Sequence, residues 1–216
     1  MFTDRREAGR LLARRLLSLG GADSVVLALP RGGVPVGFEV ALALGAPLDV
    51  VVVRKLGVPY QPELAMGAIG EDGVRVLNTE VLAASAVDDD EFAAVEQRER
   101  AELDRRAERY RRGRARIDLT GKTSIVVDDG VATGSTARAA CRVARARGAS
   151  EVILAAPVCG PDTAEHLGGD VDGIVCLEVP QRFRSVGRSY RSFRQTSDNE
   201  VVDLLRRAET RADEGR

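Results

Sequence analysis

Short continuous apolar runs recur along the chain, and they predict strands that are buried on both faces. The first run covers residues 25–29, and the pattern repeats at residues 50–53 and 124–127. Two further strands are expected at residues 152–157 and 174–177. Runs of this length, bounded by turn residues, are typical of parallel strands with helices on both sides. The pattern therefore predicts a central, mostly parallel sheet.

Segments with helical periodicity separate these runs. A first helix is expected after a capping Thr3 or Asp4, ending at Gly20-Gly21, with an apolar stripe of Ala8, Leu11, Leu12, Leu16 and Leu19. Further helices are expected at residues 34–44, 135–147 and 199–207, with fraying over residues 208–216. Strand, helix and strand in alternation form βαβ units, so the fold class is α/β and Rossmann-like.

Two segments depart from this alternation. Residues 54–62 are rich in Gly and Pro and predict a loop, and the Gly70-Glu71-Asp72-Gly73 segment that follows is a hairpin signal. Residues 88–112 predict a charged helical insertion, whose narrow apolar face holds Phe92, Val95, Leu103 and Tyr110 and is interrupted by Glu99. The acids at residues 88–91 suit the positive end of a helix better than a metal site.

Composition narrows the possible classes of protein. The 216 residues fit one domain over residues 1–216, with a core at about 25–177. The net charge of −1 gives no case for nucleic-acid or membrane binding. An apolar leader is absent from the N-terminal residues, and a cytoplasmic location is expected. The odd number of cysteines, Cys141, Cys159 and Cys176, argues against a disulfide framework and favours small buried side chains.

The segment after residues 124–127 carries the candidate chemistry. Asp128-Asp129 end the strand, a loop of small residues follows, and a helix begins near Ser135. Ligands of open parallel sheets bind beyond the carboxyl ends of the strands. Small residues let backbone N–H groups approach a phosphate, and the helix start adds a positive dipole end. Paired carboxylates would repel phosphate, so ribose hydroxyls and a hydrated Mg²⁺ suit them better.

The segment Val126-Val127-Asp128-Asp129-Gly130-Val131-Ala132-Thr133-Gly134-Ser135-Thr136 resembles the signature of type I phosphoribosyltransferases. The resemblance implies that Asp128 and Asp129 contact the ribose hydroxyls of phosphoribosyl pyrophosphate and hold Mg²⁺ through water. It also implies that the 5′-phosphate is wrapped by Gly130, Val131, Ala132, Thr133, Gly134, Ser135 and Thr136. The structural alternative is an ordinary strand-to-helix turn with a capping Thr.

Two other segments are similar to parts of this family. Arg31, Gly32 and Gly33 follow the first strand, where the family holds the diphosphate; the alternative is a tight glycine turn with a surface Arg. Arg54 and Lys55 open the segment 54–62, where the family has a mobile loop over the reacting centre; the alternative is a solvated loop. The implied catalytic residues are Arg31, Arg54, Lys55, Asp128 and Asp129. The segments 54–57, 62–69 and 183–195 further resemble predicted bacterial phosphoribosyltransferases of unassigned substrate.

The acceptor is the part that the sequence leaves open. The family builds its acceptor site partly from a variable hood, and residues 179–195 are the candidate here. Tyr190 and Phe193 either stack on a flat base or pack the tail onto the core. The tail is basic, which would suit an anionic acceptor or a second phosphate. Ala132 stands where the hypoxanthine and guanine enzymes carry an acid, which weakens that assignment, whereas the adenine enzymes also have Ala.

The resemblance implies a Mg²⁺-dependent enzyme. It would transfer ribose 5-phosphate from phosphoribosyl pyrophosphate to a nitrogen acceptor such as a nucleobase, release pyrophosphate, and act as a homodimer. One alternative is a regulatory protein that senses the same ligand and binds RNA or DNA through the basic cluster at residues 105–116. A second alternative is a hydrolase with water as acceptor. His166, the one histidine, is interpreted as a surface or packing residue.

Overall fold

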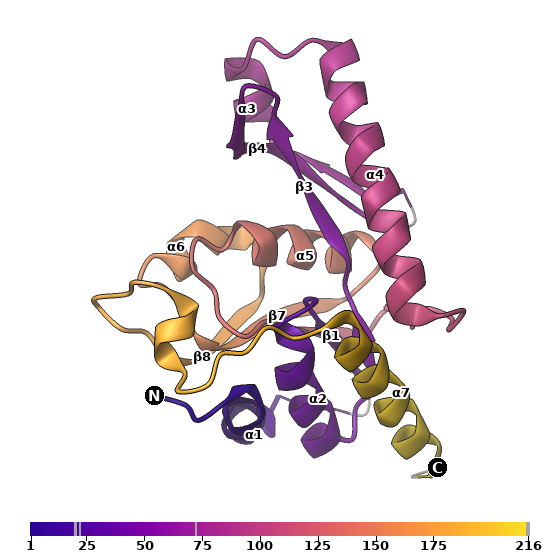
Figure 1. Ribbon diagram of the computed structural model, residues 1–216, viewed down its shortest axis with the longest axis vertical. Coiled ribbons are helices and arrows are strands. Elements are labelled where there is room, and N and C mark those ends of the chain that lie inside the picture. Colours follow the sequence, from indigo (N-terminus) through magenta and orange to yellow (C-terminus); the bar gives the residue numbers. More distant parts are fainter. Residues whose placement is uncertain (20, 22, 72, 215–216) are drawn as a thin grey trace.

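The computed structural model describes residues 1–19, 21, 23–71 and 73–214, without the side chains of His166 and of residues 212–214. The interpretation of His166 therefore lies outside the described side chains. A five-stranded sheet forms the centre of the molecule (Figure 1), in the order β2-β1-β6-β7-β8. Its strands are β1 (Ser24–Ala28), β2 (Leu48–Val50), β6 (Thr123–Val127), β7 (Glu151–Val158) and β8 (Gly173–Glu178). Every pairing in this sheet is parallel, which confirms the α/β prediction.

Helices cover both faces of this sheet (Figure 1). One face packs against α1 (Arg5–Leu16), α2 (Gly33–Leu44) and α7 (Asp198–Glu214), and the other packs against α5 (Ser135–Ala146). Alternate residues of β1 serve the two faces, with Val26 in one apolar cluster and Leu27 in the other. This double burial explains why the strands read as continuous apolar runs.

A second, antiparallel sheet rises from the central body together with two helices (Figure 1). It consists of β3 (Val53–Val58), β4 (Gln61–Gly70) and β5 (Arg75–Leu77), followed by α3 (Thr79–Ala84) and α4 (Asp89–Arg111). We call residues 53–111 the arm. The predicted loop at residues 54–62 is wrong, because most of it forms the β3–β4 hairpin. Its register shifts around Gly57, where a Cβ atom would lie 2.4 Å from the carbonyl oxygen of Pro62.

Several boundaries can be compared with the sequence. The pairing of β4 with β5 confirms the predicted hairpin, although Asp72 itself lies outside the described residues. Asp88 and Glu91 form a capping box, which confirms that the acids at residues 88–91 begin a helix. The predicted strand at 50–53 is divided between β2 and β3. Helix α1 ends at Leu16, so Leu19 is exposed beyond its stripe, and α7 continues to Glu214 rather than fraying after residue 207.

Arg111 fixes the base of the arm to the body. Its guanidinium is buried and binds two carboxylates, Asp49 within β2 and Glu71 directly after β4. The Nε atom lies 3.2 Å from Oδ1 of Asp49. The guanidinium also donates to the carbonyl oxygen of Val50 at 2.8 Å. A buried charge of this kind needs several partners, and here they come from two separate segments, β2 and the residue after β4. The orientation of the arm over the sheet therefore depends on Arg111.

The cysteines differ from the prediction. Cys159 and Cys176 form a disulfide that joins the end of β7 to β8, so the expectation that all three are unpaired is wrong. Cys141 is free and buried in α5, and burial raises the pKa of its thiol to about 12. The remaining short elements are α6 (Thr163–Leu167), η1 (Gly168–Asp170) and η2 (Val186–Ser189). Within the described residues, no helix has both the length and the apolar character needed to cross a membrane.

Candidate functional site

The loops after β1 and β6 meet at the carboxyl edge of the sheet. Because these strands are parallel neighbours, residues 30–33 and 128–136 leave the sheet side by side. A Cβ atom on Gly32 would lie 2.1 Å from Oδ2 of Asp129, and one on Gly33 would lie 2.5 Å from the carbonyl oxygen of Val127. The peptide between Pro30 and Arg31 is cis. The two predicted ligand loops thus form one continuous surface, which glycine makes possible.

The acid pair of this surface is partly buried. Oδ1 of Asp128 accepts a hydrogen bond from the backbone N–H of Asp129 at 2.8 Å. Burial, together with the neighbouring charge of Asp129, raises the pKa of Asp128 well above its ordinary value of 3.8. Oδ2 of Asp129 accepts a hydrogen bond from Nε of Arg5 at 2.7 Å. The site therefore concentrates negative charge at one carboxylate and offsets part of it with an arginine from α1.

The loop after the acid pair opens toward solvent at its second half. Gly130 and Val131 are buried, and Val131 is held by hydrogen bonds with Val158 and Gly160. Gly134 then takes a left-handed conformation, with φ 78°, and α5 begins at Ser135. Within the described chain, the backbone N–H groups of residues 133–136 have no backbone acceptor. Together with the hydroxyls of Thr133 and Ser135, 3.2 Å apart, they form a typical anion-binding helix start.

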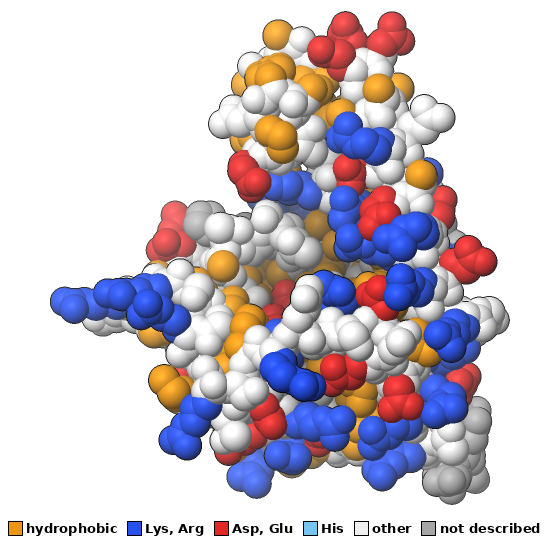
Figure 2. All heavy atoms as spheres, viewed as in Figure 1, with side chains coloured by type: hydrophobic (Ala, Val, Ile, Leu, Met, Phe, Trp, Pro, Cys, Tyr) orange, Lys and Arg blue, Asp and Glu red, His pale blue; other side chains and the backbone are white. Residues whose placement is uncertain are grey.

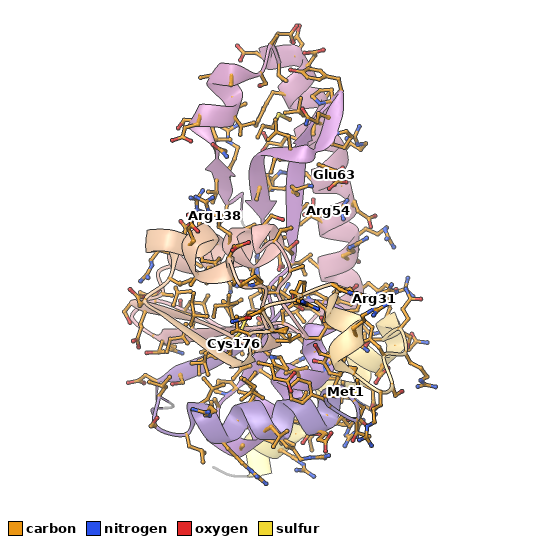
Figure 3. The ribbon with its side chains drawn as sticks, turned by 90° about the vertical axis from the view of Figure 1, so that its left-hand side faces the viewer. Met1, Arg31, Arg54, Glu63, Arg138 and Cys176 are labelled. Atoms are coloured by element: carbon orange, nitrogen blue, oxygen red, sulfur yellow. A yellow bond between two sulfur atoms is a disulfide. The ribbon has the colours of Figure 1, made fainter. Side chains whose placement is uncertain are left out.

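A cleft of about 460 Å³ separates the arm from the body, and Figure 2 shows this hollow from one side. Its walls include Pro30 and Thr136 from the body, and Arg54 and Lys55 from the arm. Glu99 of α4 accepts from Nε of Arg54 at 2.8 Å, which explains the acid on the apolar face of that helix. Lys55 Nζ donates to the carbonyl oxygen of Glu63 at 3.2 Å, and Figure 3 shows Arg54 and Glu63 together on the arm.

A second pocket, of about 350 Å³, lies between the Arg31 loop and the tail. Its lining includes Arg5, Arg31, Gly32, Asp129 and Phe193. The structure therefore distributes the predicted catalytic residues over two cavities, with Arg31 and Asp129 in one and Arg54 and Lys55 in the other. Both cavities border the loop at residues 30–33.

The tail aromatics take different positions. Tyr190 is 5% exposed, packs against Phe2 with ring centroids 5.5 Å apart, and donates from its hydroxyl to the carbonyl oxygen of Asp129 at 2.5 Å. This is the packing alternative, so Tyr190 does not present a face for a base. Phe193 is 39% exposed and lines the second pocket, with the Arg5 guanidinium 3.9 Å from its ring centroid.

Two residues of the site region were not predicted. Arg5 contacts the acid pair from the first turn of α1. Asp198, the first residue of α7, lies 3.8 Å from the Arg31 guanidinium and 3.0 Å from that of Arg109, and accepts from the Tyr110 hydroxyl at 3.1 Å. Figure 3 shows Arg31 beside α7, in agreement with this contact. Both residues begin helices. A charged side chain at that position is common, so the sequence does not indicate that it contacts a distant segment.

The basic cluster at residues 105–116 is engaged in ion pairs. Its partners are carboxylates of the same helix, of the body and of α7: Glu102 for Arg105 and Arg106, Asp198 for Arg109, Asp49 for Arg111, Glu209 for Arg114 and Glu71 for Arg116. This pairing removes much of the positive charge that a nucleic-acid contact would use.

The acid pair is also the candidate metal site. In the part of the chain that the structure describes, no group of three or more His, Cys, Asp or Glu side chains could hold a metal ion. Mg²⁺ retains several waters and is commonly bound by one or two carboxylates plus substrate phosphates. The oxygen donors of Asp128 and Asp129 fit that mode of binding, and they do not fit an all-protein cage.

Comparison with known proteins agrees with this geometry. The phosphoribosyl transferase domain family matches residues 4–188. Two Mycobacterium tuberculosis proteins, from strains CDC 1551 and H37Rv and provisionally named phosphoribosyl transferases, are each 60% identical over 208 residues, 96% of this chain and 47% of theirs. The chain thus spans about half the length of these curated relatives. The match over most of its length shows that the chain belongs to the phosphoribosyl transferase family.

Solved structures support the same fold. The crystal structure of TT1426 from Thermus thermophilus is 45% identical in sequence and superposes with a TM-score of 0.88, covering 95% of this chain and 97% of that one. The AQ2163 protein of Aquifex aeolicus is 12% identical with a TM-score of 0.51, covering 93% of this chain and 84% of that one, and shares the fold alone.

Proposed function

We propose that this chain is a Mg²⁺-dependent phosphoribosyltransferase that transfers ribose 5-phosphate from phosphoribosyl pyrophosphate to a nitrogen acceptor and releases pyrophosphate. The observation that supports this proposal most directly is the close approach of the Gly32 backbone to Asp129. A Cβ atom at Gly32 would lie 2.1 Å from Oδ2 of Asp129. A diphosphate held by the first loop would then lie directly beside a ribose held by the acid pair. Family membership supports the same donor.

The donor would extend along the carboxyl edge of the sheet. The open N–H groups and hydroxyls at residues 133–136 would bind its 5′-phosphate, the end most remote from the reacting carbon. Asp128 and Asp129 would accept hydrogen bonds from the ribose hydroxyls. The backbone N–H group of Gly32, with the Arg31 guanidinium, would hold the diphosphate. Binding energy gained at the remote phosphate would orient the reacting centre.

The chemical step places developing positive charge on the ribose and negative charge on the leaving diphosphate. Arg31, Arg54 and Lys55 would neutralise that diphosphate, and closure of the arm over the 460 Å³ cleft would exclude water. Arg54 would have to exchange its partner Glu99 for a diphosphate oxygen. Mg²⁺, when bound beside Asp128 and Asp129, would supply further charge stabilisation for the diphosphate.

Calorimetry with phosphoribosyl pyrophosphate and Mg²⁺ tests the donor assignment. The wild type is expected to bind, and the double variant Asp128→Asn/Asp129→Asn is expected to bind at least about tenfold more weakly, because it loses hydrogen bonds to charged groups. Indistinguishable signals from the two proteins, or no binding by the wild type, would refute the proposal. The melting temperature of the variant shows whether it remains folded.

The acceptor is the finer part of the proposal. We expect a nucleobase or a related flat nitrogen heterocycle, with Phe193 offering the exposed ring. Ala132 favours acceptors other than hypoxanthine and guanine. Incubation with the donor and a panel of bases, followed by a pyrophosphate assay, identifies the acceptor by release that depends on one base. Release without any base would indicate the hydrolase instead.

The sensor alternative has less support. The ion pairs of residues 105–116 occupy most of the basic side chains that it would use. Salt-dependent RNA binding without pyrophosphate release from any base would favour it nonetheless.

Family resemblance also implies a cytoplasmic homodimer, and sedimentation analysis of the purified chain tests the dimer.

A further inference from the structure

Arg5 contacts the acid pair directly, although it lies 124 positions away in the sequence. Its Nε atom is 2.7 Å from Oδ2 of Asp129, and the two side chains are only 11% and 14% exposed. An ion pair that is largely shielded from solvent is screened much less than a surface pair. This contact therefore sets the charge that the carboxylate presents to any ligand.

The guanidinium of Arg5 is held from three sides. Nη1 donates to the carbonyl oxygen of Arg194 at 2.6 Å, and the guanidinium lies 3.9 Å from the ring centroid of Phe193. Asp4, the residue before it, caps α1 by accepting from the backbone N–H of Glu7 at 2.9 Å. The contact is thus built by the start of α1 and the tail together, rather than by a flexible side chain at the surface.

Arg5 also has space to withdraw. It lines the 350 Å³ pocket with Asp129, and it also lines a neighbouring pocket of about 260 Å³ whose lining includes Asp4 and Glu200. Gln195 and Thr196 belong to both linings. The neighbouring pocket gives the Arg5 side chain space beside two other acidic residues, Asp4 and Glu200, once it releases Asp129.

The proposed function gives Asp129 a second cationic partner. A hydrated divalent cation would bind the same carboxylate that Arg5 already neutralises. Two cations beside one largely buried carboxylate repel each other, and the repulsion is stronger than in bulk water. The cation binds Asp129 only in the state in which Arg5 has released it. The measured affinity for the cation therefore includes the free-energy cost of breaking the contact between Arg5 and Asp129.

We propose that Arg5 regulates cation binding at the donor site through Asp129. Its guanidinium holds Asp129 when no cation is bound and competes with the divalent cation for this carboxylate. Arg5 thereby sets the cation concentration at which the donor binds. The inference rests on the proposed function, because the cation is the one that accompanies the donor.

The test uses Mn²⁺ alone as a spectroscopic substitute for Mg²⁺, with free Mn²⁺ measured by electron paramagnetic resonance. Arg5→Gln is expected to bind Mn²⁺ about tenfold more tightly than the wild type, the range expected for loss of one charged hydrogen bond. Arg5→Lys retains the charge and is expected to fall between the two. Adding Asp129→Asn to Arg5→Gln is expected to abolish the gain. Arg10→Gln removes an exposed arginine from the same helix and is expected to match the wild type.

The outcomes separate this inference from the proposed function. Equal or weaker Mn²⁺ binding by Arg5→Gln, compared with Arg10→Gln, would overturn the inference, as would absence of Mn²⁺ binding in every protein. Donor calorimetry over a series of Mg²⁺ concentrations gives the second measurement, and Arg5→Gln is expected to reach half-maximal donor binding at less Mg²⁺. Failure of the wild type to bind donor at any Mg²⁺ concentration would refute the proposed function, while the Mn²⁺ comparison would still decide the role of Arg5.

Discussion

Replacing Gly32 with alanine places a methyl group where the carboxylate of Asp129 already lies. The new Cβ atom would stand 2.1 Å from Oδ2 and 2.6 Å from Cγ, whereas ordinary contact begins at 3.4 Å. The carboxylate cannot simply rotate away, because Arg5 holds its Oδ2 atom at 2.7 Å. Either the carboxylate or the loop must therefore move by roughly an ångström, and overpacking of this kind costs about 1–3 kcal/mol of folding free energy.

The larger effect of Gly32→Ala is expected on ligand binding and turnover. A misplacement of about 1 Å at a reacting centre can reduce turnover by about a hundredfold. Donor calorimetry, pyrophosphate release and thermal unfolding of the same preparation separate the loss of function from the loss of stability. Gly169→Ala is the control, since a Cβ atom there meets nothing within 4 Å. Donor binding by Gly32→Ala with wild-type affinity would show that the two loops do not form a joint site.

Three further expectations follow from single residues. Because burial and Asp129 raise the pKa of Asp128, the folded protein holds that proton more tightly than the unfolded chain, so the free energy of unfolding should fall as pH rises through the raised pKa. Urea unfolding at several pH values should show this fall in the wild type and less of it in Asp128→Asn; equal slopes would contradict the assignment. Gly134→Ala imposes a side chain on a φ of 78° and should lower the free energy of unfolding by about 1 kcal/mol. It should also weaken binding of inorganic phosphate in a titration, and no change in either property would argue against the open helix start. Thiol titration in denaturant without reductant should find one thiol, Cys141, and detection of three would refute the Cys159–Cys176 disulfide.

The central sheet was predictable because its strands are covered on both faces. The runs at residues 25–29 and 124–127 are apolar at almost every position, so the pattern identifies them without any knowledge of their neighbours. The β3–β4 hairpin lacks this signal. Its first strand contains Arg54, Lys55 and Gly57, and Pro59 and Pro62 lie in the turn and in the second strand, so local preference indicated a loop. Pairing with β5 and packing against α4 and α5 override that preference.

The candidate site also contains residues with a local sequence signal and residues whose role depends on tertiary contacts. Asp128, Asp129 and the loop that follows are contiguous, and their chemistry can be interpreted from the sequence. Gly32 and Gly33 were expected to face the ligand, but the structure adds a second reason for glycine, the close approach of the acid pair. Arg5, Asp198 and the packing of Tyr190 depend on contacts between distant segments, for which a single sequence offers no periodicity or motif.

The contact between Arg5 and Asp129 also determines when, during folding, the site becomes complete. The pairing of β1 with β6 brings the two ligand loops together. Asp129 acquires its arginine only after α1 and the tail have docked, which closes a segment of 124 residues. Contacts of such long sequence separation form slowly, because their loop closure must precede any gain from the contact. A refolding chain should therefore recover its helical signal first, and its wild-type cation affinity only in the final kinetic phase.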